Sequence, residues 1–218
     1  VEDALDDGDV VFTILTAPAT GDTTYLNVDA ADVTVTNTDN DASGITVTPL
    51  TLTTTENAPG GPATFTVVLT AQPSVDVVIG LSSSDLSEGL VAPASLTFTT
   101  TNWNVAQTVT VTGVNDAVVD GPVAYLIVPA PAVSTDPNYT GANAADVAVS
   151  NTDNDAAGIT VTPTAGLVTT EAGGTATFTI ILGSQPTADV TIGLSSSDTT
   201  EGTVSPAASL MIRMRRLS

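Results

Sequence analysis

Residues 65–81 have the sequence Phe65-Thr-Val-Val-Leu-Thr-Ala-Gln-Pro-Ser-Val-Asp-Val-Val-Ile-Gly-Leu81. Apolar side chains recur at every second position in both halves of this stretch, and Pro73 lies between the halves. Successive side chains of a β-strand point to opposite faces, so a period of two is typical of a strand with one buried face. The stretch therefore predicts two consecutive β-strands that share one core.

More short strands are expected on both sides of this pair. Their apolar positions lie at 45–47, 96–98, 109–111, 123–127 and 147–149. Pro and Gly cluster between them, and no apolar period of 3.6 residues persists for three turns. About seven short strands in about 110 residues is typical of an immunoglobulin-like β-sandwich. The sequence thus predicts an all-β fold.

The chain also repeats itself. Asn37-Thr-Asp-Asn-Asp41 returns 114 positions later as Asn151-Thr-Asp-Asn-Asp155, and Gly80-Leu-Ser-Ser-Ser-Asp85 returns 113 positions later as Gly193-Leu-Ser-Ser-Ser-Asp198. Such a period is too long for a solenoid coil and matches a whole domain. We expect one complete repeat at 42–155, the C-terminal half of a repeat at 1–41 and the N-terminal half of another at 156–210.

The last residues depart from the repeat. Residues 211–218 have the sequence Met211-Ile-Arg-Met-Arg-Arg-Leu-Ser218 and contain every Arg and both Met of the chain. We interpret them as an atypical basic tail from a truncated or out-of-frame end rather than a binding tail, and assign them no function. The two half-repeats add up to one repeat. This leaves open whether they fold alone or whether neighbouring molecules complete each other by strand exchange.

The charge is strongly negative. Twenty-four acidic residues stand against three basic ones, and the net charge is −21. Binding to nucleic acid needs Lys and Arg to displace counterions, and anionic membranes attract basic segments, so neither is expected as a partner. No run of about 18 apolar residues occurs, so no membrane insertion is expected. The charge is compatible with a binding site for multivalent cations or with a merely soluble acidic secreted protein.

Residue types that most catalytic sites need are missing. The chain has no His, Cys or Lys, which excludes catalytic triads and Schiff-base chemistry. A carboxylate pair such as Asp85 and Glu88 is compatible with glycoside hydrolysis, but a repeated site with only 4% aromatic residues suits that chemistry poorly. The sequence therefore predicts that this chain is not an enzyme.

Acidic residues gather in alternate connections between the expected strands. In an antiparallel sandwich, alternate connections meet at one pole, so these side chains are expected together. Crowded carboxylates repel one another unless a cation neutralises them, and hard oxygen ligands suit Ca²⁺. The competing interpretation is that they only form turns and solubilise loops. The candidate ligands are Glu56, Asp85, Glu88, Asn115, Asp116, Asp120, Asp153 and Asp155.

One connection resembles a known family. The segment Thr112-Gly-Val-Asn-Asp-Ala-Val-Val-Asp-Gly121, the earlier Glu56 and the later Asp153 and Asp155 resemble the Calx-β domain, which is named from sodium–calcium exchangers and also occurs in long bacterial surface and secreted proteins. The resemblance covers 42–155 and both partial repeats. It implies calcium ligands at Glu56, Asp85, Asn115 with Asp116, Asp120, and Asp153 with Asp155.

Two departures from the family pattern imply fewer ions or weaker binding. Asn115 stands where the family has a carboxylate, and Asp85-Leu-Ser-Glu-Gly89 replaces the family's usual Asp-Gly-Thr-Ala segment. The leading prediction is still a calcium-binding structural and adhesive spacer of a large extracellular or bacterial cell-surface protein. Its partners would be neighbouring repeats, and calcium would stiffen their junctions. The alternative is a metal-independent module that recognises a glycan or a cell-surface protein, with Trp103 as its one candidate platform.

Overall fold

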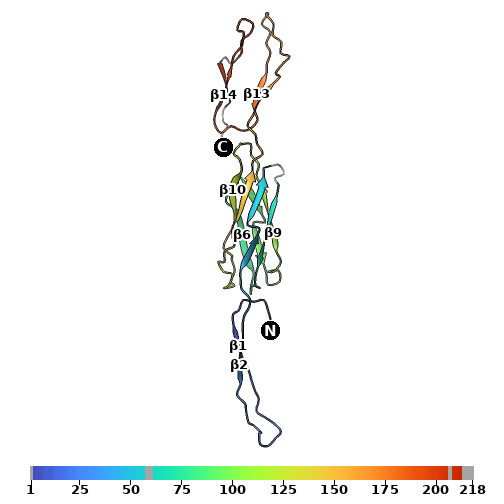
Figure 1. Ribbon diagram of the computed structural model, residues 1–218, viewed down its shortest axis with the longest axis vertical. Coiled ribbons are helices and arrows are strands. Elements are labelled where there is room, and N and C mark those ends of the chain that lie inside the picture. The colour runs from blue at the N-terminus through green and yellow to red at the C-terminus, as the bar shows by residue number, and fades with distance from the viewer. Residues whose placement is uncertain (1, 57–60, 206–207, 213–218) are drawn as a thin grey trace.

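The computed structural model describes residues 2–56, 61–205 and 208–212, the last of these as backbone only. Fifteen β-strands and no helix occur in the described residues, so none of them forms a helix that is long and apolar enough to cross a membrane. The molecule is elongated, with strands β1 (Val10–Ile14) and β2 (Val33–Asn37) at one end (Figure 1). The last strands of the chain lie at the other end.

A sandwich of two sheets forms the middle of the molecule. One sheet has the strand order β4-β11-β10-β6-β8 and the other has the order β3-β5-β9-β7. The strands are β3 (Ile45–Thr48), β4 (Thr51–Thr55), β5 (Ala63–Leu69), β6 (Val77–Ser83), β7 (Gly89–Ala92), β8 (Ser95–Phe98), β9 (Gln107–Gly113), β10 (Val123–Pro129) and β11 (Val147–Thr152).

The core contains the side chains that the two-residue period selects. Phe65 of β5 is 1% exposed, and Ile79 of β6 and Ile127 of β10 are fully buried. Each belongs to a strand in which buried and more exposed positions alternate. The structure confirms the prediction of an all-β, sandwich-like fold.

Two strands differ from the expectation. The first expected strand, at 45–47, is followed by a second one: β3 pairs with β5, whereas β4 crosses to the other sheet and pairs in parallel with β11. Pro49 lies between them and has no N–H to donate to a ladder. The other unexpected strand, β7, pairs with β9. Both strands were missed because Thr-rich or Gly-containing segments of four or five residues show no clear apolar alternation.

Four shorter strands follow the sandwich. β12 (Ile159–Thr162) pairs with β13 (Thr179–Leu182), and β14 (Val190–Leu194) pairs with β15 (Ala208–Ile212). The first two residues of the predicted atypical tail, Met211 and Ile212, thus extend a strand. Residues 213–218 of that tail lie outside the described residues.

The same contact joins the sandwich to the segment before it and to the segment after it. The backbone N–H of Gln72 donates to the carbonyl of Ala4 at 2.7 Å, and that of Gln185 donates to the carbonyl of Ala117 at 2.6 Å. Both donor and acceptor of the second bond lie 113 positions after those of the first. We call residues separated by 113 to 115 positions in this way counterparts. The loop 114–122 between β9 and β10 therefore contacts the segment that follows the sandwich.

Candidate metal centre

The parallel pairing of β4 with β11 brings Glu56 to the acidic end of β11. Thr55 lies opposite Thr152, and the Glu56 backbone N–H donates to the Thr152 carbonyl at 3.1 Å. Glu56 directly follows β4, as Asp153 directly follows β11. The two strands therefore end side by side with acidic residues, although Glu56 and Asp153 are 97 positions apart in the sequence.

Three carboxylates converge at this end of the sandwich. Glu56, Asp153 and Asp155 each offer one oxygen, and these oxygens lie within 4.8 Å of one another. It is the one such group among the described residues. Glu56 is 2% exposed, and the Asp155 Oδ2 atom is buried without a hydrogen-bond partner. We call these three residues the carboxylate trio.

The electrostatics of the trio favour a bound positive charge. Burial raises the pKa of Glu56, and the negative charges of Asp116, Asp153 and Asp120 raise it further, against one hydrogen bond from the Asn154 N–H. Backbone N–H donors, first that of Asp155 and then that of Gly121, lower the pKa of Asp153 and keep it ionised. All three Arg of the chain lie at 213–216, so no described residue carries a basic side chain. Protein groups near the trio leave its negative charge without a counterion.

The loop between β9 and β10 is held against the trio. The backbone N–H groups of Asp120 and Gly121 donate to Asp153 Oδ2 at 3.1 and 2.8 Å. Gly121 has φ +75°, a conformation that other residues adopt only with strain. The Asn115 side-chain oxygen accepts a hydrogen bond from Asn154 Nδ2 at 3.0 Å. The structure thus places the exposed Asn115, Asp116 and Asp120 beside the trio, where the last two raise the pKa of Glu56.

Glu88 and Asp85 lie in the connection between β6 and β7 and differ in their surroundings. Glu88 is 6% exposed, and burial raises its pKa, with Asp120, Asp85 and Asp116 contributing further negative charge. Asp85 instead accepts hydrogen bonds from the backbone and hydroxyl of Ser87, which lower its pKa. Glu88 therefore faces the same acidic loop as the trio, whereas Asp85 mainly closes its own turn.

Asn151 is a functional candidate that the sequence reasoning missed. It is 1% exposed and links three elements: Thr54 Oγ1 donates to its Oδ1 at 2.9 Å, and its Nδ2 donates to the Val114 carbonyl at 3.0 Å and to Glu88 Oε2 at 3.3 Å. A Cβ on Gly113 would collide with Asn151 Oδ1. The signal was available, because Asn151 opens the repeated Asn-Thr-Asp-Asn-Asp motif, but an isolated Asn is also typical of a turn.

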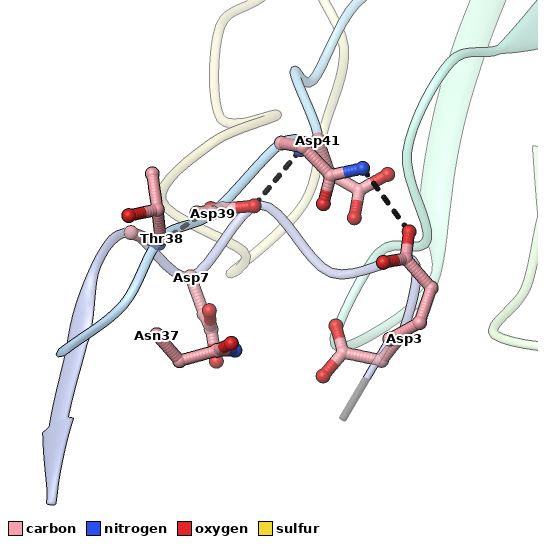
Figure 2. Close-up of a pocket in the computed structure, with 9 residues that line it drawn as sticks. Asp3, Asp7, Asn37, Thr38, Asp39 and Asp41 are labelled. Atoms are coloured by element: carbon pink, nitrogen blue, oxygen red, sulfur yellow. Dashed lines mark hydrogen bonds between the residues drawn. The ribbon is translucent and has the colours of Figure 1, made fainter. Parts of the chain in front are cut away.

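A second acidic group repeats this geometry near the N-terminus. Figure 2 shows Asp3, Asp7, Asn37, Asp39 and Asp41 around a cavity of about 180 Å³. The Gly8 N–H donates to Asp39 Oδ2 at 2.7 Å and the Asp41 N–H to Asp39 Oδ1 at 2.9 Å. The counterpart bonds run from Gly121 and Asp155 to Asp153. Glu56 has no counterpart among residues 2–41, and these residues do not form a trio.

Trp103, the candidate recognition platform, packs against the core. It is partly buried there, and its carbonyl accepts the Leu69 N–H at 3.1 Å. This position matches a side chain that covers the edge of a core.

No protein-family model and no curated protein match this chain. Solved structures match between 49% and 79% of it. A crystal structure of the apo form of the Calx CBD1 domain is 16% identical over 53% of this chain and all of that one, with a TM-score of 0.41. The periplasmic chaperone SfaE is 8% identical over 51% of this chain and 58% of its own, with a TM-score of 0.40.

A third match is WR4, an MSP family member of Caenorhabditis elegans. It is 19% identical over 50% of this chain and 97% of its own, with a TM-score of 0.33. At these identities and TM-scores the three structures assign neither a family nor a function to the chain.

Proposed function

We propose that this chain is a calcium-binding structural and adhesive spacer of an extracellular or cell-surface protein, in which calcium stiffens the junctions between successive β-modules. One observation carries the proposal: Glu56, Asp153 and Asp155 present oxygens within 4.8 Å of one another where no described basic side chain can balance them. The buried, unpaired Asp155 Oδ2 supports it, because a buried polar atom without a partner is costly unless a ligand satisfies it.

The donor atoms favour calcium over other metals. Every candidate ligand is a carboxylate or amide oxygen, and the chain has no His or Cys for zinc or copper. Calcium accepts six to eight oxygens in flexible geometry, which suits a trio supplemented by neighbouring side chains, carbonyls and water. The trio would form the inner part of the site, and Asp116, Asp120 and Glu88 would add ligands or negative charge. The resemblance of 112–121 to the Calx-β domain points to the same ion.

The junction contact explains how an ion would affect stiffness. The loop 114–122 donates hydrogen bonds to Asp153 on one side and accepts the Gln185 N–H at Ala117 on the other. A cation that fixes this loop on the trio would therefore fix the next segment as well. Without it, like charges push the loop from the trio and the junction loosens.

In an extracellular module we expect weak calcium binding. Calcium sites of such modules have dissociation constants of about 10⁻⁴–10⁻³ M, which depend on ligand charge and site rigidity, and here Asn115 contributes no charge. Such a site fills only where calcium is near millimolar. Neighbouring modules of the same chain would be its structural partners, and a cell-surface protein or glycan would be its adhesive partner.

Calcium titration calorimetry and thermal unfolding in calcium and in EDTA test the proposal. We expect binding heat, a higher unfolding midpoint in calcium, and loss of both in Asp155→Asn. The matched control is Asp146→Asn, because Asp146 is exposed in the same sandwich and the substitution removes the same charge. The absence of binding heat, together with identical midpoints in calcium and EDTA, would reject the proposal.

A further inference from the structure

The pole of the sandwich opposite the carboxylate trio presents hydrogen-bond donors to the segment that precedes β1 (Figure 1). The backbone N–H of Gln72 donates to the Ala4 carbonyl at 2.7 Å. The backbone N–H of Ser43 donates to Asp6 Oδ2 at 2.8 Å, and the Asn138 side chain donates to the Asp6 carbonyl. We call Ser43, Gln72 and Asn138 the donor patch. The sandwich supplies only donors at these contacts, and the preceding segment supplies only acceptors.

A buried carboxylate holds two parts of the donor patch together. Asp136 is 4% exposed, and its Oδ2 accepts the Ser74 N–H at 2.6 Å and the Ser74 hydroxyl at 2.9 Å. Its Oδ1 accepts the Asn138 N–H at 2.8 Å. Burial tends to raise the pKa of Asp136, but the hydrogen bonds that it accepts lower the pKa further, so the carboxylate stays ionised. Asp136 therefore ties the loop that carries Asn138 to the loop that carries Gln72.

Two more side chains fix the rest of the patch. Tyr139 is 1% exposed, and its hydroxyl donates to the carbonyl of Ala71 at 2.7 Å and accepts the N–H of the same residue at 3.2 Å. The hydroxyl and the backbone N–H of Thr70 donate to the carbonyls on either side of Ser43, at 2.7 and 3.0 Å. Contacts within the sandwich thus position all three donors before a neighbouring segment binds them.

The acceptor side differs between the two junctions of the chain. We call the junction before the sandwich the first junction and the junction after it the second. Asp6 is half-buried and supplies two of the three acceptors at the first junction. Its counterpart Val119 is 45% exposed and has no side-chain acceptor. The counterpart of Ser43 is Ala157, so the backbone donor is conserved between the junctions while the carboxylate is not.

We propose that Asp6 locks the first junction to the donor patch without calcium, whereas the second junction, with Val119 in the same place, needs calcium to become stiff. The lock stands on the hydrogen bonds, and the statement about the second junction rests on the proposed function. A backbone N–H bonded to a carboxylate is a charge-assisted hydrogen bond and is stronger than a bond between neutral groups. One residue of this loop therefore decides whether a junction responds to calcium.

Distances between two spin labels measure the stiffness of each junction in the 218-residue chain, which has no Cys of its own. Labels on Thr13→Cys and Thr97→Cys span the first junction, and labels on Thr97→Cys and Thr160→Cys span the second. All three positions are exposed. In EDTA we expect a narrow distance distribution across the first junction and a broad one across the second. Calcium should narrow the second distribution alone. A first distribution as broad as the second in EDTA would overturn the lock.

Substitution of Asp6 isolates the contribution of its carboxylate. Asp6→Val installs the counterpart residue and should broaden the first distribution in EDTA, with about a tenfold rise in the open population, because a hydrogen bond to a charged group is lost. The matched control is Asp29→Val, which removes the same charge at an exposed position between β1 and β2. Circular dichroism checks that both variants fold. Equal broadening in the two variants, or none in Asp6→Val, would contradict the proposal.

The reciprocal substitution tests whether this position is sufficient. Val119→Asp places a carboxylate within reach of the Ala157 N–H and should narrow the second distribution in EDTA. Ala117→Asp adds the same charge at another exposed position of the loop and should not. Equal effects of these two variants would reject the role of position 119. A first junction that loosens in Asp6→Val, with no response of either junction to calcium, would support the lock and reject the calcium site, so the two proposals can fail separately.

Discussion

Replacing Asn151 by alanine should destabilise the sandwich strongly, while the same replacement at its counterpart Asn37 should not. Asn151 is 1% exposed and takes part in three hydrogen bonds, to Thr54, Val114 and Glu88. Asn37 occupies the same position of the same motif in β2 but is exposed. The two substitutions therefore differ in burial and not in local sequence.

The magnitude follows from the partners that lose their hydrogen bonds. A buried hydrogen bond contributes about 1 kcal/mol, and a buried group left unpaired costs about 1–3 kcal/mol. The Thr54 hydroxyl can still interact with the Tyr125 hydroxyl, 3.4 Å away, but the Val114 carbonyl loses this donor. We expect Asn151→Ala to lower the free energy of unfolding by about 2–4 kcal/mol. Asn37→Ala should change it by less than about 0.5 kcal/mol, as is usual at exposed sites.

Urea unfolding followed by circular dichroism, in EDTA and at low protein concentration, measures the free energy of unfolding of both variants. The midpoint should fall for Asn151→Ala with little change in slope, because the surface exposed on unfolding stays the same. Calcium titration of the same variant should show weaker binding, because Asn151 positions Glu88 and the start of the loop 114–122. Equal losses of stability in the two variants would refute the role assigned to burial and to the hydrogen-bond network.

Three further predictions concern the acidic pole, the end of the sandwich where the carboxylate trio and the loop 114–122 lie. Glu56→Gln should raise the unfolding midpoint in EDTA and abolish its rise in calcium, because it removes a buried charge that only a cation balances; a variant that keeps the full calcium effect would contradict this. In EDTA the pH dependence should follow the raised pKa values of Glu56 and Glu88, whose protonation stabilises the fold. This stabilisation is complete below about pH 4.5 and is lost as pH rises through the folded-state pKa values. Mild acidification from pH 7 should therefore raise the unfolding midpoint of the metal-free protein and lower that of the calcium-bound protein. Unfolding midpoints that change with pH in the same way in both conditions would contradict this assignment. Gly113→Ala should destabilise by about 1–3 kcal/mol, the usual cost of overpacking, because its Cβ would clash with both Asn151 Oδ1 and the Thr55 backbone carbonyl, whereas Gly158→Ala has open space and should be neutral by urea unfolding; equal effects of the two substitutions would contradict the close packing at Gly113.

Much of the sandwich could be predicted because its signal is local. The alternation at 65–69 and 75–81 depends only on the two-residue period of a strand, and the core contains Phe65, Val67, Leu69, Val77 and Ile79 as expected. Val75, expected to open the second of these strands, instead precedes β6 and is 40% exposed. The strands β4 and β7 were missed because their pairing partners β11 and β9, rather than their own apolar period, hold them in place.

The acidic pole could be predicted only as a group of residues. Strand order and alternation indicated which connections share a pole, and the structure brings together Glu56, Asp153 and Asp155, with Asp116 and Asp120 close enough to raise the pKa of Glu56. The sequence could not predict which carboxylate oxygens lie within a few ångströms of one another. The turn around Asp85 and the buried position of Asn151 depend on contacts with Ser87 and with Thr54, Val114 and Glu88.

By itself, then, the sequence determined the strand periodicity, the spacing of repeated motifs and a surplus of acid without any nearby base. Only the tertiary structure decided that β4 pairs in parallel with β11, so that Glu56 and Asp153 end adjacent strands. The physical reason is that periodicity and charge belong to each short segment, whereas the distance between two carboxylates 97 positions apart is set by the whole fold between them.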